Sequence, residues 1–240
     1  LYICLGPFYI QLQSAIKGDY MQTELSSKRQ INHKVMRAIV GFIALALSPV
    51  VWLLSGSDNV LTSISISYWT DSRDIFVGSL VAIGFFLSAY NGSGDGRDWE
   101  YYLSKVACIF AICVAIFPTE GFSDEDIPAK WVQAIAEPIG VAPGSIHNGA
   151  AILLFGCLIV LMWFFSVRAM KKSRPGRAYF YRGVSISIGA GIIGILVIGK
   201  LFKLTDTIFW VESWGLTLFG IGWLAAGIYR SDNHTPQAFP

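Results

Sequence analysis

The sequence predicts an all-α protein: an integral membrane bundle of six transmembrane helices with both termini in the cytoplasm. Three observations lead to this prediction: the composition, six apolar segments, and the distribution of basic residues. Of the 240 residues, 54% are hydrophobic and 14% are charged, whereas soluble domains carry about 25% charged residues. With a mean hydropathy of +0.54, the chain has too few charges to cover a water-soluble globule, so lipid is the expected solvent.

Six apolar segments follow one another along the chain. They cover residues 38–54, 75–90, 101–117, 146–167, 183–199 and 208–229. A helix that crosses a bilayer needs about 20 apolar residues, with a range of roughly 17 to 25. No segment alternates polar and apolar residues with a period of two, so the pattern favours a helical bundle over a barrel.

The first three segments depart from an uninterrupted apolar run. The first contains Pro49 near its outer end, and the second is short by itself. We expect the aromatic and aspartate-containing turns that flank the second segment to complete its span. Lys105 interrupts the third segment, close enough to the helix end for its ammonium group to reach the headgroups.

The fifth segment carries small residues at a spacing of four. Because lipid provides no hydrophobic drive for helix association, close backbone approach through small residues takes its place. We therefore expect this helix at the centre of the bundle. The pairs are Ser185 with Gly189, Ser187 with Gly191, and Ala190 with Gly194.

The sixth segment has two contrasting faces. At 100° per residue, Glu212, Gly215 and Gly222 fall on one face. Trp210 and Trp214 fall nearly opposite. We expect the glycine face to point into the bundle together with Glu212, and the tryptophans to point outward at headgroup level.

Basic residues are distributed unequally between the two sides of the predicted bundle. With the N-terminus in the cytoplasm, residues 1–37, 91–105, 168–182 and 230–240 hold 14 of the 18 Lys and Arg. The outer loops 55–74, 118–145 and 200–207 hold the other 4. This bias predicts that both termini are cytoplasmic. The stretch RAMKKSRPGRAYFYR, residues 168–182, is either a plain topology determinant or also a site that attracts anionic headgroups.

The chain divides into three predicted parts. Residues 1–36 form a cytoplasmic or interfacial segment, 37–230 the transmembrane domain, and 231–240 a tail. The opening LYICLGPFYIQL is too short to span and lacks the basic start of a signal peptide. We expect residues 1–20 to be either a non-native extension ahead of Met21 or an interfacial segment. In the longest loop, 118–145, residues 131–137 have the length of one short helix, either a lid or a connector.

Ionisable residues gather toward the outer ends of the predicted helices. Such groups are costly at membrane depth and usually pair or face water. Glu212 is therefore the residue of most interest, with Lys200 as its expected partner and Arg73 as the next choice. The cluster is either an ion pair that fixes packing or a polar pocket open to the outside. The candidate pocket residues are Ser65, Ser67, Tyr68, Arg73, Asp74, His147, Lys200 and Glu212.

The densest polar stretch is SISYWTDSRDIFVG, residues 65–78, which leads into the second apolar segment. The alternation in SISIS predicts that it lies on the membrane surface with its hydroxyls on the polar side. Asp71 or Asp74 is expected to cap the helix that follows, because Asp is favoured at helix N-termini.

No metal or cofactor site is expected. The topology places His33 and His234 in the cytoplasm and His147 outside, so the three histidines cannot share a site. The chain has no H-E-x-x-H, Walker A, G-x-S-x-G or dinucleotide-binding pattern. The cysteines lack metal-binding spacing and are expected to be small core residues with free thiols. They are Cys4, Cys108, Cys113 and Cys157.

Several of these stretches resemble a known group of proteins. They are SISYWTDSRDIFVG, AIFPTEG at the end of the third segment, His147 at the start of the fourth, and FWVESWGLTLFGIGWL in the sixth. Together they resemble the uncharacterised bacterial six-helix membrane proteins grouped as a domain of unknown function, which are distantly similar to the DRAM-like and Sfk-like membrane proteins. The resemblance covers roughly residues 35 to 230 and implies a six-helix bundle in the bacterial inner membrane, with no established reaction. The chain departs from the family at Trp69–Thr70, where a further Tyr or His is common.

Three functions of different classes remain open. A non-enzymatic protein that binds a lipid or small amphiphile, as a sensor or partner of other membrane proteins, predicts a dead-end cavity at Glu212. A transporter or channel predicts a polar path and broken helices near the midplane. A membrane hydrolase similar to the alkaline ceramidases predicts His147 near a serine or carboxylates. Polar residues on one side only favour the first function. We expect membrane lipids and other membrane proteins as partners, and no nucleic acid.

Overall fold

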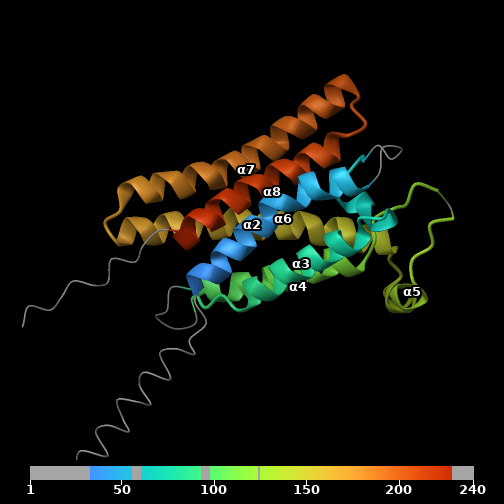
Figure 1. Ribbon diagram of the computed structural model, residues 1–240, viewed down its shortest axis with the longest axis horizontal. Coiled ribbons are helices and arrows are strands. Elements are labelled where there is room, and N and C mark those ends of the chain that lie inside the picture. Colours follow the sequence, from blue (N-terminus) through green and yellow to red (C-terminus); the bar gives the residue numbers. More distant parts are fainter. Residues whose placement is uncertain (1–32, 56–60, 93–97, 124, 229–240) are drawn as a thin grey trace, which may run out of the picture. The chain divides into compact units, whose positions relative to one another are not determined.

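The computed structural model describes residues 33–55, 61–92, 98–123 and 125–228 (Figure 1). The predictions for residues 1–20, Met21, Cys4 and His234 lie outside these residues. From Lys34 onward the described residues belong to one compact unit. They form helices and no strand, which confirms the all-α class. The elements are α2 (His33–Leu54), η1 (Ser65–Trp69), α3 (Arg73–Ser88), α4 (Trp99–Ile116), α5 (Lys130–Ala136), η2 (Glu137–Ile139), α6 (Pro143–Lys171), α7 (Pro175–Phe202) and α8 (Thr207–Ile228).

Five helices of the described part are long and apolar enough to cross a membrane: α2, α4, α6, α7 and α8. This agrees with a multi-pass membrane protein. The helix of the second predicted segment, α3, has 16 residues, which is just below the range of roughly 17 to 25 that a bilayer requires. Pro49 lies inside α2 without ending the helix.

The helix α6 lies at the centre of the packing. It packs against α4, α7 and α8, while α3 packs on α4. The buried aromatic rings of Phe165, Phe219 and Trp223 stack at centroid distances of 5.1 and 5.3 Å between neighbours. Tyr90, just after α3, closes the same cluster at 5.6 Å from Trp223. This aromatic layer fills the half of the bundle toward the turn between α6 and α7.

The glycine face of α8 points into the bundle, as the sequence predicted. A Cβ added at Gly220 would lie 2.9 Å from the carbonyl oxygen of Gly41, so the backbones of α8 and α2 are in contact there. Gly215 makes room for the ring of Phe155 and Gly222 for Met162. Glu212 is 9% exposed, so it points inward.

The prediction that the fifth segment is central is wrong. Among the described helices, its helix α7 packs mainly against α6 and α8, and many of its large side chains are exposed. Added Cβ atoms at Gly183 and Gly194 would meet no neighbour within 4 Å. The small residue at Gly191 instead makes room for a side chain, Trp214, whose indole N–H donates to the carbonyl of Ser187 at 2.9 Å.

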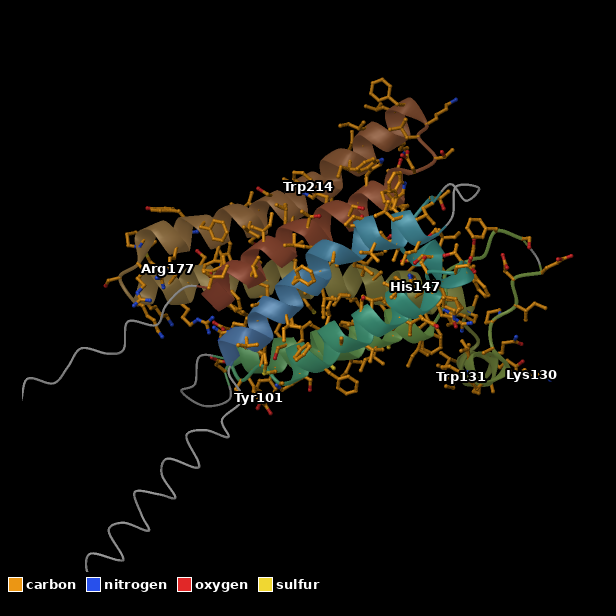
Figure 2. All side chains as sticks on the ribbon, viewed as in Figure 1. Tyr101, Lys130, Trp131, His147, Arg177 and Trp214 are labelled. Carbon is orange, nitrogen blue, oxygen red and sulfur yellow. The ribbon has the colours of Figure 1, made fainter. Side chains whose placement is uncertain are left out.

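The tryptophans of α8 both point outward, as the sequence predicted. Trp210 is 54% exposed and donates to Asp206 at 2.7 Å. Trp214 is 41% exposed, so it also points outward, and its indole donates to Ser187 where α7 and α8 pack together (Figure 2). The absence of a side chain at Gly191 lets the indole reach the carbonyl oxygen of Ser187, which accepts this hydrogen bond in addition to its bond within the helix.

The polar stretch before α3 does not lie on a surface. Ser65, Ser67 and Tyr68 are buried in the 3-10 helix η1, and the intervening Ile66 is buried as well. The hydroxyls turn inward to bond, as in the Ser67 Oγ–H that donates to Ile64 O at 2.6 Å. The prediction of a surface segment is wrong because the 3-10 turn places both the polar and the apolar side chains inside the bundle.

The capping prediction for α3 is also wrong. Its N-cap residue is Ser72, and no side chain caps the helix. Ser72 Oγ bonds to Ser55 Oγ at 2.8 Å. Asp74 lies in the first turn, where its charge still interacts favourably with the helix dipole.

Two shorter features agree with the sequence. The helix expected over residues 131–137 is present as α5 and η2, with Val132 and Ala136 buried. Three of the cysteines are free thiols, as predicted: Cys108, Cys113 and Cys157.

Candidate functional site

The side chain of Glu212 joins α8 to the segment that carries η1. Its Oε1 accepts from the hydroxyl of Ser65 at 2.6 Å. Its Oε2 accepts from the backbone N–H of Ile64 at 2.5 Å and from that of Ser65 at 3.3 Å. These three donors replace the water that a buried carboxyl group loses.

The expected ion pairs of Glu212 are wrong. No basic side chain of the described residues contacts its carboxyl group. Lys200 is exposed near the end of α7. Arg73 donates instead to the phenol oxygen of Tyr68 at 2.8 Å and lies 4.3 Å from the centroid of that ring. Lys200 was the expected partner because only a short turn separates it from the helix of Glu212. In the structure the backbone N–H groups of Ile64 and Ser65 lie where a cation was expected.

His147 lies on α6, which packs against α8, the helix of Glu212. It is 2% exposed, and its Nδ1 is 2.6 Å from the carbonyl oxygen of Phe117. A carbonyl only accepts, so Nδ1 carries the hydrogen and donates. In the neutral ring, Nε2 then carries a lone pair. Nε2 has no hydrogen-bond partner among the described residues.

Glu212, Ser65 and His147 line one cavity of about 810 Å³. Its walls come from α6, α7, α8, the segment 62–66 and residues 119–121 after α4. One end is polar and holds these three residues with Ser63 and Asn148. The remaining wall between α6 and α7 is apolar and includes Ile152, Phe155, Ile159, Ile192, Ile193 and Leu196. The cavity is therefore amphipathic along its length.

The cavity lies at the end of the bundle that the sequence assigns to the outside. Figure 2 shows His147 and Arg177 at opposite ends of the bundle. Arg177 belongs to the basic stretch between α6 and α7, which the positive-inside rule places in the cytoplasm.

The structure brings together three of the eight candidate pocket residues. Ser65, His147 and Glu212 line the cavity. Ser67 and Tyr68 are buried in η1 next to it, and Arg73 is engaged with Tyr68. Asp74 and Lys200 are exposed and are not part of the cavity wall.

A second polar cluster lies at the opposite end and was missed by the sequence analysis. Arg168 and Glu100 form a salt bridge at 2.8 Å, with side chains 20% and 9% exposed. The hydroxyl of Tyr90 donates to Glu100 at 2.7 Å and accepts from Arg168 at 2.6 Å. Arg37 lies over the Tyr90 ring at 5.3 Å. In the sequence Glu100 is one of several acidic residues on the predicted cytoplasmic side, with Asp95 and Asp98, so nothing there singled it out.

No group of three or more His, Cys, Asp or Glu side chains that could hold a metal ion occurs among residues 33–55, 61–92, 98–123 and 125–228. A scan against models of protein families found no match, and searches of curated proteins and of solved structures found no similar protein.

Proposed function

We propose that this protein is a multi-pass protein of the bacterial inner membrane that binds a lipid or small amphiphile in an outward-facing cavity, as a sensor or as a partner of other membrane proteins. In this proposal α3 is the sixth span, and both termini are cytoplasmic. The observation that carries the proposal is the cavity of about 810 Å³, polar at Glu212 and apolar between α6 and α7.

The shape and lining of the cavity support an amphiphile over a small polar solute. Its volume lies within the range of about 300–1,000 Å³ that is usual for small-molecule sites. An acyl chain packs against the apolar wall of Phe155, Ile159 and Ile192 through van der Waals contacts, which take the place of a hydrophobic drive within a membrane. The headgroup then meets hydrogen-bonding partners at the polar end.

The inner half of the bundle argues against a channel. The side chains beyond the cavity are large and buried, with Phe165 2%, Phe219 0% and Trp223 1% exposed. A permeation path needs polar groups or space at this level. The aromatic layer gives neither in the described residues, so the cavity is a dead end.

A membrane hydrolase is the second candidate, because Ser65 shares the cavity with His147, whose Nε2 has no partner among the described residues. Against it, the Ser65 hydroxyl donates to Glu212 and not to an imidazole. Incubating the purified protein with lipid esters and amides and following their hydrolysis distinguishes the two candidates. Turnover that is lost in both Ser65→Ala and His147→Ala favours the hydrolase.

Native mass spectrometry of the detergent-purified full chain tests binding. Gly156 lines the cavity, and an added Cβ would meet no atom within 4 Å, so Gly156→Phe is expected to fill the space with its ring. Gly183→Phe is the matched control, since Gly183 also has open space around it but lies outside the cavity wall. Phe is a better helix former than Gly, so neither variant weakens its helix through the backbone.

We expect an amphiphile to co-purify with the wild type and Gly183→Phe and to be absent from Gly156→Phe. An empty wild type, or equal occupancy of all three proteins, contradicts the proposal. The orientation is tested separately with single cysteines in a cysteine-free background. Ser123→Cys should react with an impermeant maleimide in intact cells, and Ser173→Cys only after permeabilisation.

A further inference from the structure

We propose that the cavity selects amphiphiles whose headgroup is uncharged and donates hydroxyl groups, of the monoacylglycerol type, and that it rejects phosphate and carboxylate headgroups. This inference rests on the proposed function and adds the chemical class of the ligand. It starts from the charges and the free hydrogen-bonding groups at the polar end.

The cavity wall that the described residues form contains two carboxyl groups and no basic side chain of Lys or Arg. The carboxyl groups belong to Glu212 and Glu120. The cations that the sequence suggested are absent from the wall, because Arg73 is held by Tyr68 and Lys200 is exposed on α7. An anionic headgroup at the polar end therefore loses hydration and finds no cation that would compensate for it.

The group without a partner at this end is an acceptor. His147 is buried, and its Nδ1–H is used by Phe117, so Nε2 offers a lone pair. A buried acceptor without a partner loses its hydration and gains nothing in return. A ligand hydroxyl is a donor that satisfies it, whereas a phosphate or carboxylate oxygen brings a second acceptor to the same place.

Glu212 and Ser63 also offer hydrogen-bonding positions to a ligand that carries several hydroxyl groups. Glu212 receives three hydrogen bonds from protein donors, and a carboxylate has about four acceptor positions, so one remains for a ligand hydroxyl. Ser63 Oγ already accepts from the N–H of Ile66 at 3.0 Å, which leaves its own hydrogen for a ligand oxygen. The two acceptors, His147 Nε2 and the carboxyl group of Glu212, and the one neutral donor, the Ser63 hydroxyl, suit a headgroup with more than one hydroxyl group.

The test compares two ligands with the same oleoyl chain and glycerol backbone. Monooleoylglycerol and monooleoyl lysophosphatidate differ by one phosphate, and oleylamine provides a cationic headgroup. Each is titrated into the delipidated full chain, and the bound fraction is followed by native mass spectrometry. We expect monooleoylglycerol to bind at least about tenfold more tightly than lysophosphatidate, because the cavity offers no cation in exchange for the hydration of the phosphate.

Two conservative variants separate the role of the carboxyl group from that of the lone pair. Glu212→Gln keeps an acceptor for the N–H groups of Ile64 and Ser65 and replaces the carboxyl group by a neutral amide that can also donate. This variant should therefore narrow the ratio of the two dissociation constants. His147→Asn retains an amide N–H for Phe117 O and removes the Nε2 acceptor, so it should weaken monooleoylglycerol about tenfold. Circular dichroism of both variants confirms that they are folded.

The outcomes separate this inference from the proposed function. Equal or tighter binding of lysophosphatidate, blocked by Gly156→Phe, overturns the headgroup selection and leaves the amphiphile site standing. Tighter binding of oleylamine than of monooleoylglycerol also overturns it, in favour of a cationic headgroup. Failure of all three ligands to bind, with an empty protein as purified, overturns the proposed function itself.

Discussion

The crossing of α2 and α8 gives the sharpest test of the packing. Gly41 lies in α2, and a Cβ added there would be 2.6 Å from Leu224 N and 2.8 Å from Gly220 O. Ordinary contact begins at 3.4 Å, so the two backbones must separate by 3.4 − 2.6 = 0.8 Å. Both obstructing atoms belong to helix backbones and cannot rotate away. Gly41→Ala is therefore expected to destabilise the protein by about 1–3 kcal/mol, the usual cost of overpacking.

The same separation threatens a hydrogen bond between these helices. Ser48 Oγ and Ser213 Oγ are 2.6 Å apart, and a shift of 0.8 Å along that line takes them to 2.6 + 0.8 = 3.4 Å, beyond the ordinary range for two hydroxyls. Unfolding in dodecyl sulfate, followed by circular dichroism in mixed micelles, measures the change in the free energy of unfolding.

Gly183→Ala in α7 is the matched control, because its Cβ would meet nothing within 4 Å. This control should be neutral or slightly stabilising, since Ala is favoured over Gly in helices by up to about 1 kcal/mol. If Gly41→Ala is as stable as Gly183→Ala, the backbone contact between α2 and α8 is wrong.

Two further predictions concern other contacts. Gly191→Ala brings a Cβ to 1.9 Å from the indole nitrogen of Trp214, a side chain that can move away. We therefore expect the free energy of unfolding to fall by only about 1 kcal/mol, and the tryptophan emission to shift as the hydrogen bond to Ser187 breaks. Unchanged emission contradicts the packing of Trp214 against Gly191. A double-mutant cycle of Glu100→Gln and Arg168→Gln should give a coupling energy of about 1.5–3 kcal/mol, measured by the same unfolding assay, and additive effects contradict the buried pair.

Part of the candidate site was predictable from the sequence, because it depends on a single helix. The 100° rotation per residue placed Glu212 on the glycine face of α8, and the structure confirms that face as buried. The partner of Glu212 was not predictable in the same way. Ile64 and Ser65 are 148 and 147 residues away, and backbone N–H groups leave no mark on the sequence.

The small residues of α7 show the limit of a spacing rule. Four-residue spacing of Ser and Gly states that a close approach is possible, but not what approaches. At Gly191 the neighbour is the ring of Trp214, whereas the backbone contact of the bundle is at Gly41 and Gly220. Likewise, Arg168 belongs to the basic stretch 168–182 in the sequence, and only its distance of 2.8 Å from Glu100 reveals a buried pair.

The sequence by itself determined the helical class, the membrane-spanning lengths of five helices, the short helix after α4 and the inward face of α8. All of these follow from local quantities: hydrophobic length, helical periodicity and composition. Only the tertiary structure decided that η1 folds into the bundle, that its N–H groups take the place of a cation at Glu212, and that His147 lines the same cavity. The physical reason is that a buried polar group takes whichever donor or acceptor packing brings within about 3 Å, and that choice depends on residues far apart in the chain.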